Sequence, residues 1–252
     1  MVKFGLIGNP IGHSVSPRVF AEAYGGCWPY DLIEGADFEA SWQKFLGEYQ
    51  AINITTPFKE PAFRKVAAEG ALGGCGFGDN SEEITADAIR ALGAINIAVK
   101  ETDGLVHGYN SDYLGVLKLL RNRGFGPGST VVVAGFGGAG KAAAAAARAA
   151  GCDVVVCNRS RYNPEIRPLE ELSVLCAVAD LLIYTLAVPI PELKEISSGQ
   201  GGAHGPAAIL EANYRTPCLA DRPGYIPGTE WHKAQAETGY PLMTGCPVSV
   251  GF

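Results

Sequence analysis

The stretch that decides the fold is V-V-V-A-G-F-G-G-A-G-K, which runs from Val131 to Lys141. The apolar, mostly β-branched residues at 131–134 predict a strand buried on both faces of a parallel sheet. Glycines then break the run, and the alanine-rich segment 142–150 predicts a helix with Gly151 as its left-handed C-terminal cap. A second apolar run at 153–157 completes a βαβ pattern. The segment therefore predicts the opening of a Rossmann-like dinucleotide-binding domain.

The glycines of this turn have separate expected roles. Gly135 allows the tight turn, Gly137 the close approach of a pyrophosphate, and Gly140 close packing of helix against strand. Gly138 and Ala139 fall at the helix N-terminus, where free N–H groups and the helix dipole favour phosphate. A glycine-rich turn alone is often only a turn, but the flanking strands and helix favour a nucleotide site.

The residues after the second strand indicate which dinucleotide is bound. An NAD site usually carries an acidic residue there for the ribose 2′-hydroxyl. This chain instead has Asn158-Arg159-Ser160, followed by Arg161. A guanidinium would hold an anionic 2′-phosphate that a carboxylate would repel, so we expect NADP. The alternative is a solvated basic turn.

Composition limits the other possibilities. The 252 residues allow one large domain or two small ones, with a hydrophobic content of 47% that is ordinary for an α/β protein. The net charge of −6 argues against nucleic acid, and no apolar run is long enough to span a membrane. We see no signal peptide and no cluster of metal ligands, so we expect no bound metal. Seven cysteines without a C-x-x-C pair suggest reduced thiols and a cytoplasmic location.

A polar segment with two serines follows the first predicted strand, Val2–Ile7. Ser16, which precedes Pro17, is expected to be the N-cap of a helix. Capping leaves Ser14 unexplained. A helix N-terminus flanked by two hydroxyl groups would also suit a carboxylate ligand.

A lysine follows another predicted strand, Ala51–Thr55. Lys59 lies in what reads as a Pro-rich loop at 56–61, where a lysine is commonly a solvated surface residue. In open parallel sheets, however, ligands bind beyond the carboxyl ends of the strands. Lys59 is therefore a candidate for ligand contact.

The middle of the chain combines a glycine-rich segment with polar residues near strand ends. Gly70–Ser81 is expected to be an exposed, mobile loop. Asn96 lies in a predicted strand at 93–99 and would need hydrogen-bond partners, while Asp112 is expected to cap the helix Tyr113–Arg123. The remaining predicted elements are a helix at 84–92, a hairpin turn at 103–104, strands at 105–109, 179–185 and 207–210, and a last helix at 228–244.

Five ordered motifs together resemble shikimate dehydrogenases. They are G-H-S-V-S-P at 12–17, N-I-T-T-P-F-K-E at 53–60, G-A-I-N at 93–96, G-Y-N-S-D at 108–112, and G-F-G-G-A-G-K at 135–141 with N-R-S at 158–160. Near the end, Gly228-x-x-Trp231-x-x-x-Gln235 has the spacing of the family's closing G-x-x-M-L-x-x-Q segment. The resemblance covers the chain from Phe4 to Gly245.

The resemblance implies an activity: NADPH-dependent, reversible reduction of 3-dehydroshikimate to shikimate in aromatic amino-acid biosynthesis. Hydride addition to a ketone builds alkoxide character on the oxygen, so the reaction needs a proton donor beside it. The resemblance implies that Lys59 transfers this proton and that Asp112 holds the lysine. Ser14 and Ser16 match the pair that binds the substrate carboxylate. The groups matching those that contact the substrate ring are Thr55, Asn96, Asp112, Tyr214 and Gln235. The glycines match the pyrophosphate site, and Asn158, Arg159 and Ser160 match the adenosine phosphate site.

The resemblance also implies an α/β fold with two domains. The substrate-binding and catalytic domain would comprise residues 1–109 together with the C-terminal helix segment 229–252. An NADP-binding, Rossmann-like domain would comprise residues 110–228, and both ligands would lie between the domains. The small-molecule substrate is the only partner expected besides the cofactor, and the protein would be a monomer or homodimer.

Three departures from the family pattern leave alternatives open. Near the nicotinamide, where the family commonly has Asn-Thr/Ala-Thr-Pro, this chain has Tyr184-Thr185-Leu186-Ala187. The glycine-rich stretch around 70–80 is longer than expected. In the closing segment, Trp231-His232 replaces Met-Leu. A quinate/shikimate dehydrogenase of broader range is the nearest alternative, although quinate-preferring relatives often replace one serine of the pair with threonine. A methylenetetrahydrofolate dehydrogenase would not need the serine pair. A nucleotide-sensing, non-catalytic relative would have no use for Lys59 and Asp112.

Overall fold

The computed structural model describes residues 1–73, 86–160, 164–196 and 205–249. The chain divides into two compact units. The first comprises Met1–Ser111 and Gln235–Phe252, and the second comprises Asp112–Ala234. The last helix, α8 (Gly228–Thr244), is shared, because the division falls within it. Each unit is described by itself below.

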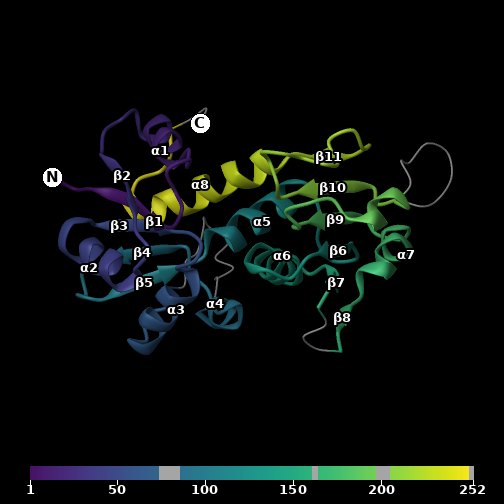
Figure 1. Ribbon diagram of the computed structural model, residues 1–252, viewed down its shortest axis with the longest axis horizontal. Helices are drawn as coiled ribbons and strands as arrows, with labels where there is room; N and C mark the ends of the chain where they lie inside the picture. Colours follow the sequence, from purple (N-terminus) through teal and green to yellow (C-terminus); the bar gives the residue numbers. More distant parts are fainter. Residues whose placement is uncertain (74–85, 161–163, 197–204, 250–252) are drawn as a thin grey trace. The chain divides into compact units, whose positions relative to one another are not determined.

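The first unit is built on a five-stranded sheet in the order β2-β1-β3-β4-β5 (Figure 1). Strands β1, β2 and β3 are parallel, whereas β4 runs antiparallel to both β3 and β5. The strands are β1 (Phe4–Gly8), β2 (Tyr30–Glu34), β3 (Ala51–Ile54), β4 (Ile97–Lys100) and β5 (Val106–Tyr109). The helices are α1 (Ser16–Tyr24), α2 (Phe38–Glu48), α3 (Lys59–Ala68) and α4 (Ala86–Leu92), together with the C-terminal part of α8.

Helices cover both faces of this sheet. Because side chains alternate along a strand, residues in register share one face. Phe4, Ala51 and Val99 share a face, and they form one core with residues of α1 and α8. Gly108 lies on the opposite face, where a Cβ atom on it would be 3.1 Å from Val66 of α3. The sheet is therefore the middle of three layers.

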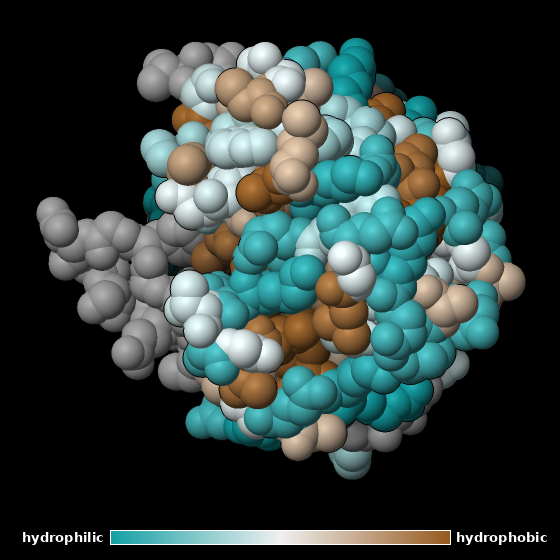
Figure 2. All heavy atoms as spheres, turned by 90° about the vertical axis from the view of Figure 1, so that its left-hand side faces the viewer, coloured by the Kyte–Doolittle hydropathy of each residue, from teal (hydrophilic) through white to brown (hydrophobic). Residues whose placement is uncertain are grey.

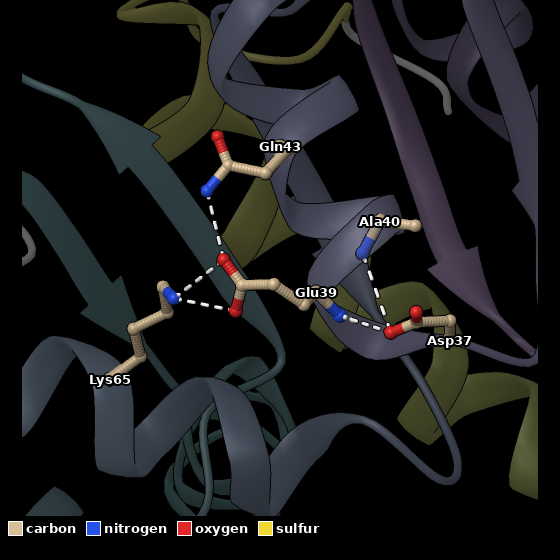
Figure 3. Close-up of polar contacts among 5 residues, drawn as sticks. All are labelled: Asp37, Glu39, Ala40, Gln43 and Lys65. Carbon is tan, nitrogen blue, oxygen red and sulfur yellow. Dashed lines mark hydrogen bonds and ion pairs between the residues drawn. The ribbon is translucent and has the colours of Figure 1, made fainter.

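An ion pair on the surface of this unit ties α2 to α3 (Figure 3). Asp37 caps α2 by accepting a hydrogen bond from the backbone N–H of Glu39 at 2.8 Å. The Glu39 carboxylate in turn accepts hydrogen bonds from Gln43 at 2.8 Å and from Lys65 of α3 at 2.7 Å. These donors lower the pKa of Glu39, with Lys65 contributing most.

The second unit is a six-stranded, wholly parallel sheet in the order β11-β10-β9-β6-β7-β8. Read from β8 to β11, with β6 counted as strand 1, this is the order 3-2-1-4-5-6 of the doubly wound dinucleotide-binding fold. The strands are β6 (Thr130–Ala134), β7 (Asp153–Cys157), β8 (Ile166–Arg167), β9 (Leu181–Tyr184), β10 (Ala208–Glu211) and β11 (Tyr225–Ile226). The helices are α5 (Ser111–Asn122), α6 (Gly138–Ala149) and α7 (Leu172–Cys176), with the first part of α8.

The core of the second unit depends on small and β-branched residues. Val131, Val132, Val133 and Ala134 are fully buried, as expected for a central parallel strand. Val132 and Ala134 pack with residues of α7, while α6 packs against β6, β7 and β9 through its buried alanines. Gly151 has φ of 86° after α6, which confirms the predicted left-handed C-terminal cap.

The α/β prediction is confirmed, but several local predictions were wrong. Lys59 does not lie in a loop: it begins α3, and Pro61 fits the first turn because its missing N–H has no helical partner there. Asp112 lies in the first turn of α5 rather than at its N-cap. The sequence patterns also failed to predict α2 and the strands β2, β8 and β11.

The prediction of an exposed, mobile loop at 70–81 is wrong for the first residues of that segment. Ala71 and Leu72 are buried, and Leu72 forms a bridge with Gly108 of β5. The Gly73 N–H donates to the Gly108 carbonyl at 3.0 Å. This segment is therefore attached to the edge of the first sheet. Residues 74–81 lie outside the described part of the chain.

One face of the molecule is mostly hydrophilic (Figure 2). Figure 2 shows a face on which hydrophilic residues dominate and hydrophobic atoms form separate groups. No helix in the described residues is long and apolar enough to cross a membrane. Nor do these residues contain a group of three or more His, Cys, Asp or Glu side chains suited to a metal ion.

Candidate active site

Several predicted site residues of the first unit lie at one edge of its sheet. The parallel strands β1 and β3 end at this edge, and the antiparallel strand β4 begins there. Strand β5, which pairs antiparallel with β4, ends there as well. The segments that carry Ser14, Thr55 and Asn96 therefore leave or enter the sheet at a common edge. The fold of the first unit thus brings together residues that are up to about eighty positions apart in the sequence.

The two serines contact each other. Ser14 Oγ donates to Ser16 Oγ at 3.0 Å and accepts from the Ser16 backbone N–H at 3.2 Å. Val15, not Ser16, occupies the N-cap position of α1, and its side chain makes no capping bond. The prediction that Ser16 caps this helix was therefore wrong. Both side chains are partly buried. Their hydrogen-bonded hydroxyl groups form a local pair at the start of α1.

Lys59 and Thr55 are held by backbone hydrogen bonds around the end of β3. The Thr55 N–H donates to the Ile7 carbonyl at 3.0 Å, which extends the pairing of β3 with β1. A Cβ atom on Gly8 would lie 2.4 Å from Cγ2 of Thr55, so this close approach requires glycine. The Lys59 carbonyl accepts from Ile95 N–H at 3.3 Å, which ties the start of α3 to the segment before β4. Both side chains are partly exposed.

Asn96 has the partners that its buried position requires. Its Nδ2 donates to Ser111 Oγ at 3.0 Å, and its Oδ1 accepts from the Ser111 N–H at 2.7 Å. Only 7% of Asn96 and 4% of Ser111 is exposed, so the pair is well shielded from water. Ser111 directly precedes Asp112, and this network therefore fixes the backbone at the start of α5. No signal in the sequence marked Ser111 beyond its place in G-Y-N-S-D.

Gln235 enters the first unit on α8. The close contact of this helix with the sheet comes from Gly239, one turn later, where a Cβ atom would lie 2.7 Å from Ile97 and 2.9 Å from Ser111. Gln235 is partly buried. Because residues four apart share a helix face, Gln235 lies on the same side of α8 as Gly239.

The glycine turn of the second unit has the geometry that its spacing predicts. Gly135 has φ of 100° and lies against Thr185, and a Cβ atom on Gly140 would be 2.1 Å from the Gly135 carbonyl oxygen. These two glycines are required by close packing. Gly137 and Gly138 differ from them, because a Cβ atom there would meet nothing within 4 Å. Gly137 is the N-cap of α6, so the free N–H groups of the helix follow it directly.

Thr185 and Tyr184 mark the point where the strand order reverses between β6 and β9. Thr185 Oγ1 donates to the Ala134 carbonyl at 2.9 Å and holds the end of β9 against the glycine turn. Tyr184 is fully buried, and its hydroxyl group donates to the Val188 carbonyl at 2.7 Å. Burial raises the pKa of Tyr184. Tyr184 is thus a core residue, and the role of Thr185 was not found from the sequence.

The predicted 2′-phosphate residues form a turn immediately after β7. Asn158 Nδ2 donates to the Ser160 carbonyl at 2.8 Å, which closes the turn. Arg159 and Ser160 are exposed. Arg161 lies outside the described residues. Asn158 therefore shapes a turn that presents the Arg159 side chain to solvent.

Tyr214 lies in a turn that is held by polar side chains. Asn213 Oδ1 accepts from the backbone N–H groups of Arg215 and Thr216, both at 3.2 Å. The Tyr214 ring packs against His232 of α8, with ring centroids 5.4 Å apart. Glu211, which is fully buried, accepts from the Cys218 N–H at 2.8 Å and the Leu219 N–H at 3.1 Å. Sequence reasoning found Tyr214 only through the family resemblance, and it missed Asn213 and Glu211.

The parallel sheet, its strand order and the glycine turn define a two-unit α/β protein of the Rossmann-type, dinucleotide-binding class. A more specific assignment comes from curated relatives. The shikimate dehydrogenase (NADP(+)) of Halobacterium salinarum is 31% identical over 233 residues, which cover 85% of this chain and 80% of that protein. The enzyme of the same name from Haloarcula marismortui matches with the same identity and coverage. This chain therefore belongs to the shikimate dehydrogenase family.

Solved structures share the fold. Shikimate 5-dehydrogenase from Thermus thermophilus, solved in complex with shikimate, is 24% identical, with a TM-score of 0.76 over 99% of this chain and 95% of that chain. Shikimate dehydrogenase from Aquifex aeolicus has a TM-score of 0.79 at 21% identity, and the match covers 99% of this chain and 94% of that chain. Quinate dehydrogenase from Corynebacterium glutamicum, solved in complex with NAD, has a TM-score of 0.75 at 18% identity. The match covers 98% of this chain and 95% of that chain. No protein-family model matches the sequence.

Proposed function

We propose that this protein catalyses the NADPH-dependent, reversible reduction of 3-dehydroshikimate to shikimate in the biosynthesis of aromatic amino acids through chorismate. The observation that carries this proposal is the 31% identity with enzymes named shikimate dehydrogenase (NADP(+)). The chemistry of the residues at the edge of the first sheet and at the glycine turn supports it.

The second unit fits a dinucleotide. Open space beside Gly137 and Gly138, at the free N-terminus of α6, suits a pyrophosphate that must approach the backbone closely. Arg159, exposed in the turn after β7, suits the adenosine 2′-phosphate, with Asn158 and Ser160 shaping that turn. The residues proposed to hold NADP are Gly135, Gly137, Gly138, Ala139, Gly140, Asn158, Arg159 and Ser160. When bound, NADPH supplies the hydride.

Lys59 is the proposed acid and base. Hydride addition to a ring ketone makes the oxygen basic, so a proton donor beside it lowers the barrier. An ammonium group at the start of α3 provides that proton in reduction, and the neutral amine removes it in oxidation. Asp112 is proposed to hold the lysine in place.

Polar groups of the first unit are proposed to bind the substrate. The Ser14 and Ser16 hydroxyl groups already contact each other, and both can turn to donate to a carboxylate. Thr55, Asn96 and Gln235 offer hydroxyl and amide groups for the ring hydroxyls, as do Asp112 and Tyr214 of the second unit. The first unit, with residues 235–252, is thus the proposed substrate domain, and the second is the proposed NADP domain.

We further propose that the protein acts in the cytoplasm as a monomer or homodimer. The six cysteines within the described residues are all free thiols, which suits a reducing compartment. Fractionation of cells that express the protein and sedimentation of the purified chain would test the two parts of this proposal.

The decisive experiment measures NADPH oxidation by the purified protein with 3-dehydroshikimate. Parallel reactions replace NADPH with NADH, and the reverse reaction compares shikimate with quinate. We expect turnover with 3-dehydroshikimate and NADPH, a lower kcat/KM with NADH, and a lower kcat/KM with quinate. A wild-type protein that folds but does not turn over 3-dehydroshikimate would contradict the proposal. A preference for quinate would favour the broader quinate/shikimate enzyme instead.

A further inference from the structure

The first turns of α8 carry a pair of residues that departs from the family pattern. Trp231 and His232 stand where the closing family segment has Met-Leu. Trp231 is buried, and its Nε1 donates to the backbone carbonyl of Asp112 at 3.2 Å. This bond ties α8 to the first turn of α5. The helix that carries His232 is therefore fixed relative to Asp112 within the second unit.

His232 contacts the Tyr214 ring. The two ring centroids are 5.4 Å apart and the planes are inclined by 43°, within the range of favourable aromatic pairs. The Arg215 guanidinium also contacts this tyrosine, with Cζ 5.9 Å from the ring centroid. The Tyr214 ring thus has a contact from α8 and a second one from its own turn.

The surroundings of His232 favour a neutral imidazole. Burial lowers the pKa of His232, and the positive charge of Arg215 lowers it further, while the negative charge of Asp112 partly opposes both effects. A neutral imidazole packs against Tyr214 without placing a second cation beside Arg215. At neutral pH the ring pair is therefore not disturbed by charge repulsion.

The backbone around Tyr214 is already held by other groups. Asn213 accepts from two N–H groups of the turn, and its Nδ2 donates to the Thr216 carbonyl at 3.1 Å. Fixing the backbone still leaves the two side-chain torsions of a tyrosine free to change. The ring of His232 is a contact from outside the turn that restricts those torsions.

We propose that His232 is a positioning residue for substrate binding, which holds the Tyr214 ring so that its hydroxyl group faces the substrate. This inference rests on the proposed function and deepens it, because it assigns a role to a residue that departs from the family pattern. The competing reading is that His232 only fills space in the second unit. The two readings differ in what a leucine, the residue of the family pattern, would do at this position.

The test compares His232→Leu with His232→Phe in steady-state kinetics with shikimate and NADP. Because Phe keeps an aromatic ring and Leu does not, Leu should raise the KM for shikimate about two- to tenfold, whereas Phe should stay near wild type. The KM for NADP and kcat should change less than about twofold in both variants. His107→Leu is the matched control: it removes a histidine whose side chain pairs with Asp103 in the β4–β5 hairpin.

A pH profile adds a readout that a space-filling role would not change. Protonation makes His232 a cation that Asp112 attracts and Arg215 repels, so the position of its ring against Tyr214 should change. The wild-type KM for shikimate should therefore rise as the pH falls through the lowered pKa of His232. In His232→Phe that rise should be absent. Asp112 and Arg215 remain in both proteins, so their own effects cancel in the comparison.

Three results would overturn the inference while leaving the proposed function intact. They are an unchanged shikimate KM in His232→Leu, equal impairment of the Leu and Phe variants, and parallel changes in the KM values for shikimate and NADP. If His232→Leu does not fold, His232→Gln, which is polar and lacks a ring, takes its place with the same expected result. A wild-type protein that is inactive with shikimate would instead remove the proposed function, and this inference with it.

Discussion

The two units prepare their sites in opposite ways. At the edge of the first sheet, polar side chains are supplied by strand ends and held by specific bonds, such as that between Asn96 and Ser111. At the glycine turn of the second unit, the essential feature is the lack of side chains, since a Cβ atom on Gly140 would lie 2.1 Å from a backbone oxygen. The first site should therefore lose function when a side chain is removed. The glycine turn should lose stability or affinity when one is added.

The largest expected effect is on the first site. Lys59→Ala should lower turnover by about two to four orders of magnitude, the usual contribution of a general acid–base group, with little change in substrate affinity. Asp112→Asn should also lower turnover, and the double variant should be less than additive if both act as one unit. Lys65→Ala is the control, because that lysine makes a surface ion pair. More than a tenth of wild-type turnover in Lys59→Ala would exclude the lysine from proton transfer.

A smaller effect is expected when a side chain is removed from the second site. Arg159→Ala should weaken NADPH binding by about 1.5–3 kcal/mol, or roughly tenfold to more than a hundredfold, because a bond to a charged phosphate is lost. NADH binding should hardly change, since NADH has no 2′-phosphate. Titration with both cofactors measures the difference, and Arg148→Ala on α6 is the control. Equal losses for the two cofactors would mean that Arg159 is structural.

The next prediction tests the glycine turn itself. Gly140→Ala should lower the free energy of unfolding by about 1–3 kcal/mol, because the added methyl group meets the Gly135 carbonyl. Gly137→Ala should leave stability nearly unchanged, since the space beside it is open and its φ of −74° suits alanine. That variant should nevertheless bind NADPH more weakly. Denaturant unfolding and cofactor titration separate the two, and equal stability of both variants would contradict the distinction.

The smallest expected effect concerns the surface ion pair between Glu39 of α2 and Lys65 of α3. Because Lys65 and Gln43 lower the pKa of Glu39, its contribution to stability is present above the unfolded-state pKa of about 4.3 and is lost as the pH falls through the lower folded value. Glu39→Gln should therefore reduce the loss of stability in acid. Glu60→Gln, which affects a pair within α3, is the control. Identical acid unfolding curves for wild type and Glu39→Gln would show that the ion pair between Glu39 and Lys65 contributes nothing to stability.

The difference between the units also explains which parts of the fold could be predicted. The parallel sheet of the second unit was predicted because its signals are local: four apolar residues, a glycine turn and an alanine-rich helix lie within about twenty positions. The first unit has weaker signals, and α2 and β2 were missed. Its strand β2 is only partly buried along most of its length, so the sequence lacks the continuous apolar run that marks a central strand.

The sequence by itself determined the α/β class, the glycine turn with its separate roles for Gly135 and Gly140, and the candidate residues, through the order of their motifs. Only the structure decided that the Ser14 hydroxyl accepts from the Ser16 backbone N–H instead of Ser16 capping α1, and that Lys59 begins a helix. It alone revealed the partners of Asn96 and the contact of His232 with Tyr214. The physical reason for the last two is range: propensity and periodicity act over a few residues, whereas the contacts of Asn96 and His232 join segments that only strand pairing and helix packing bring together.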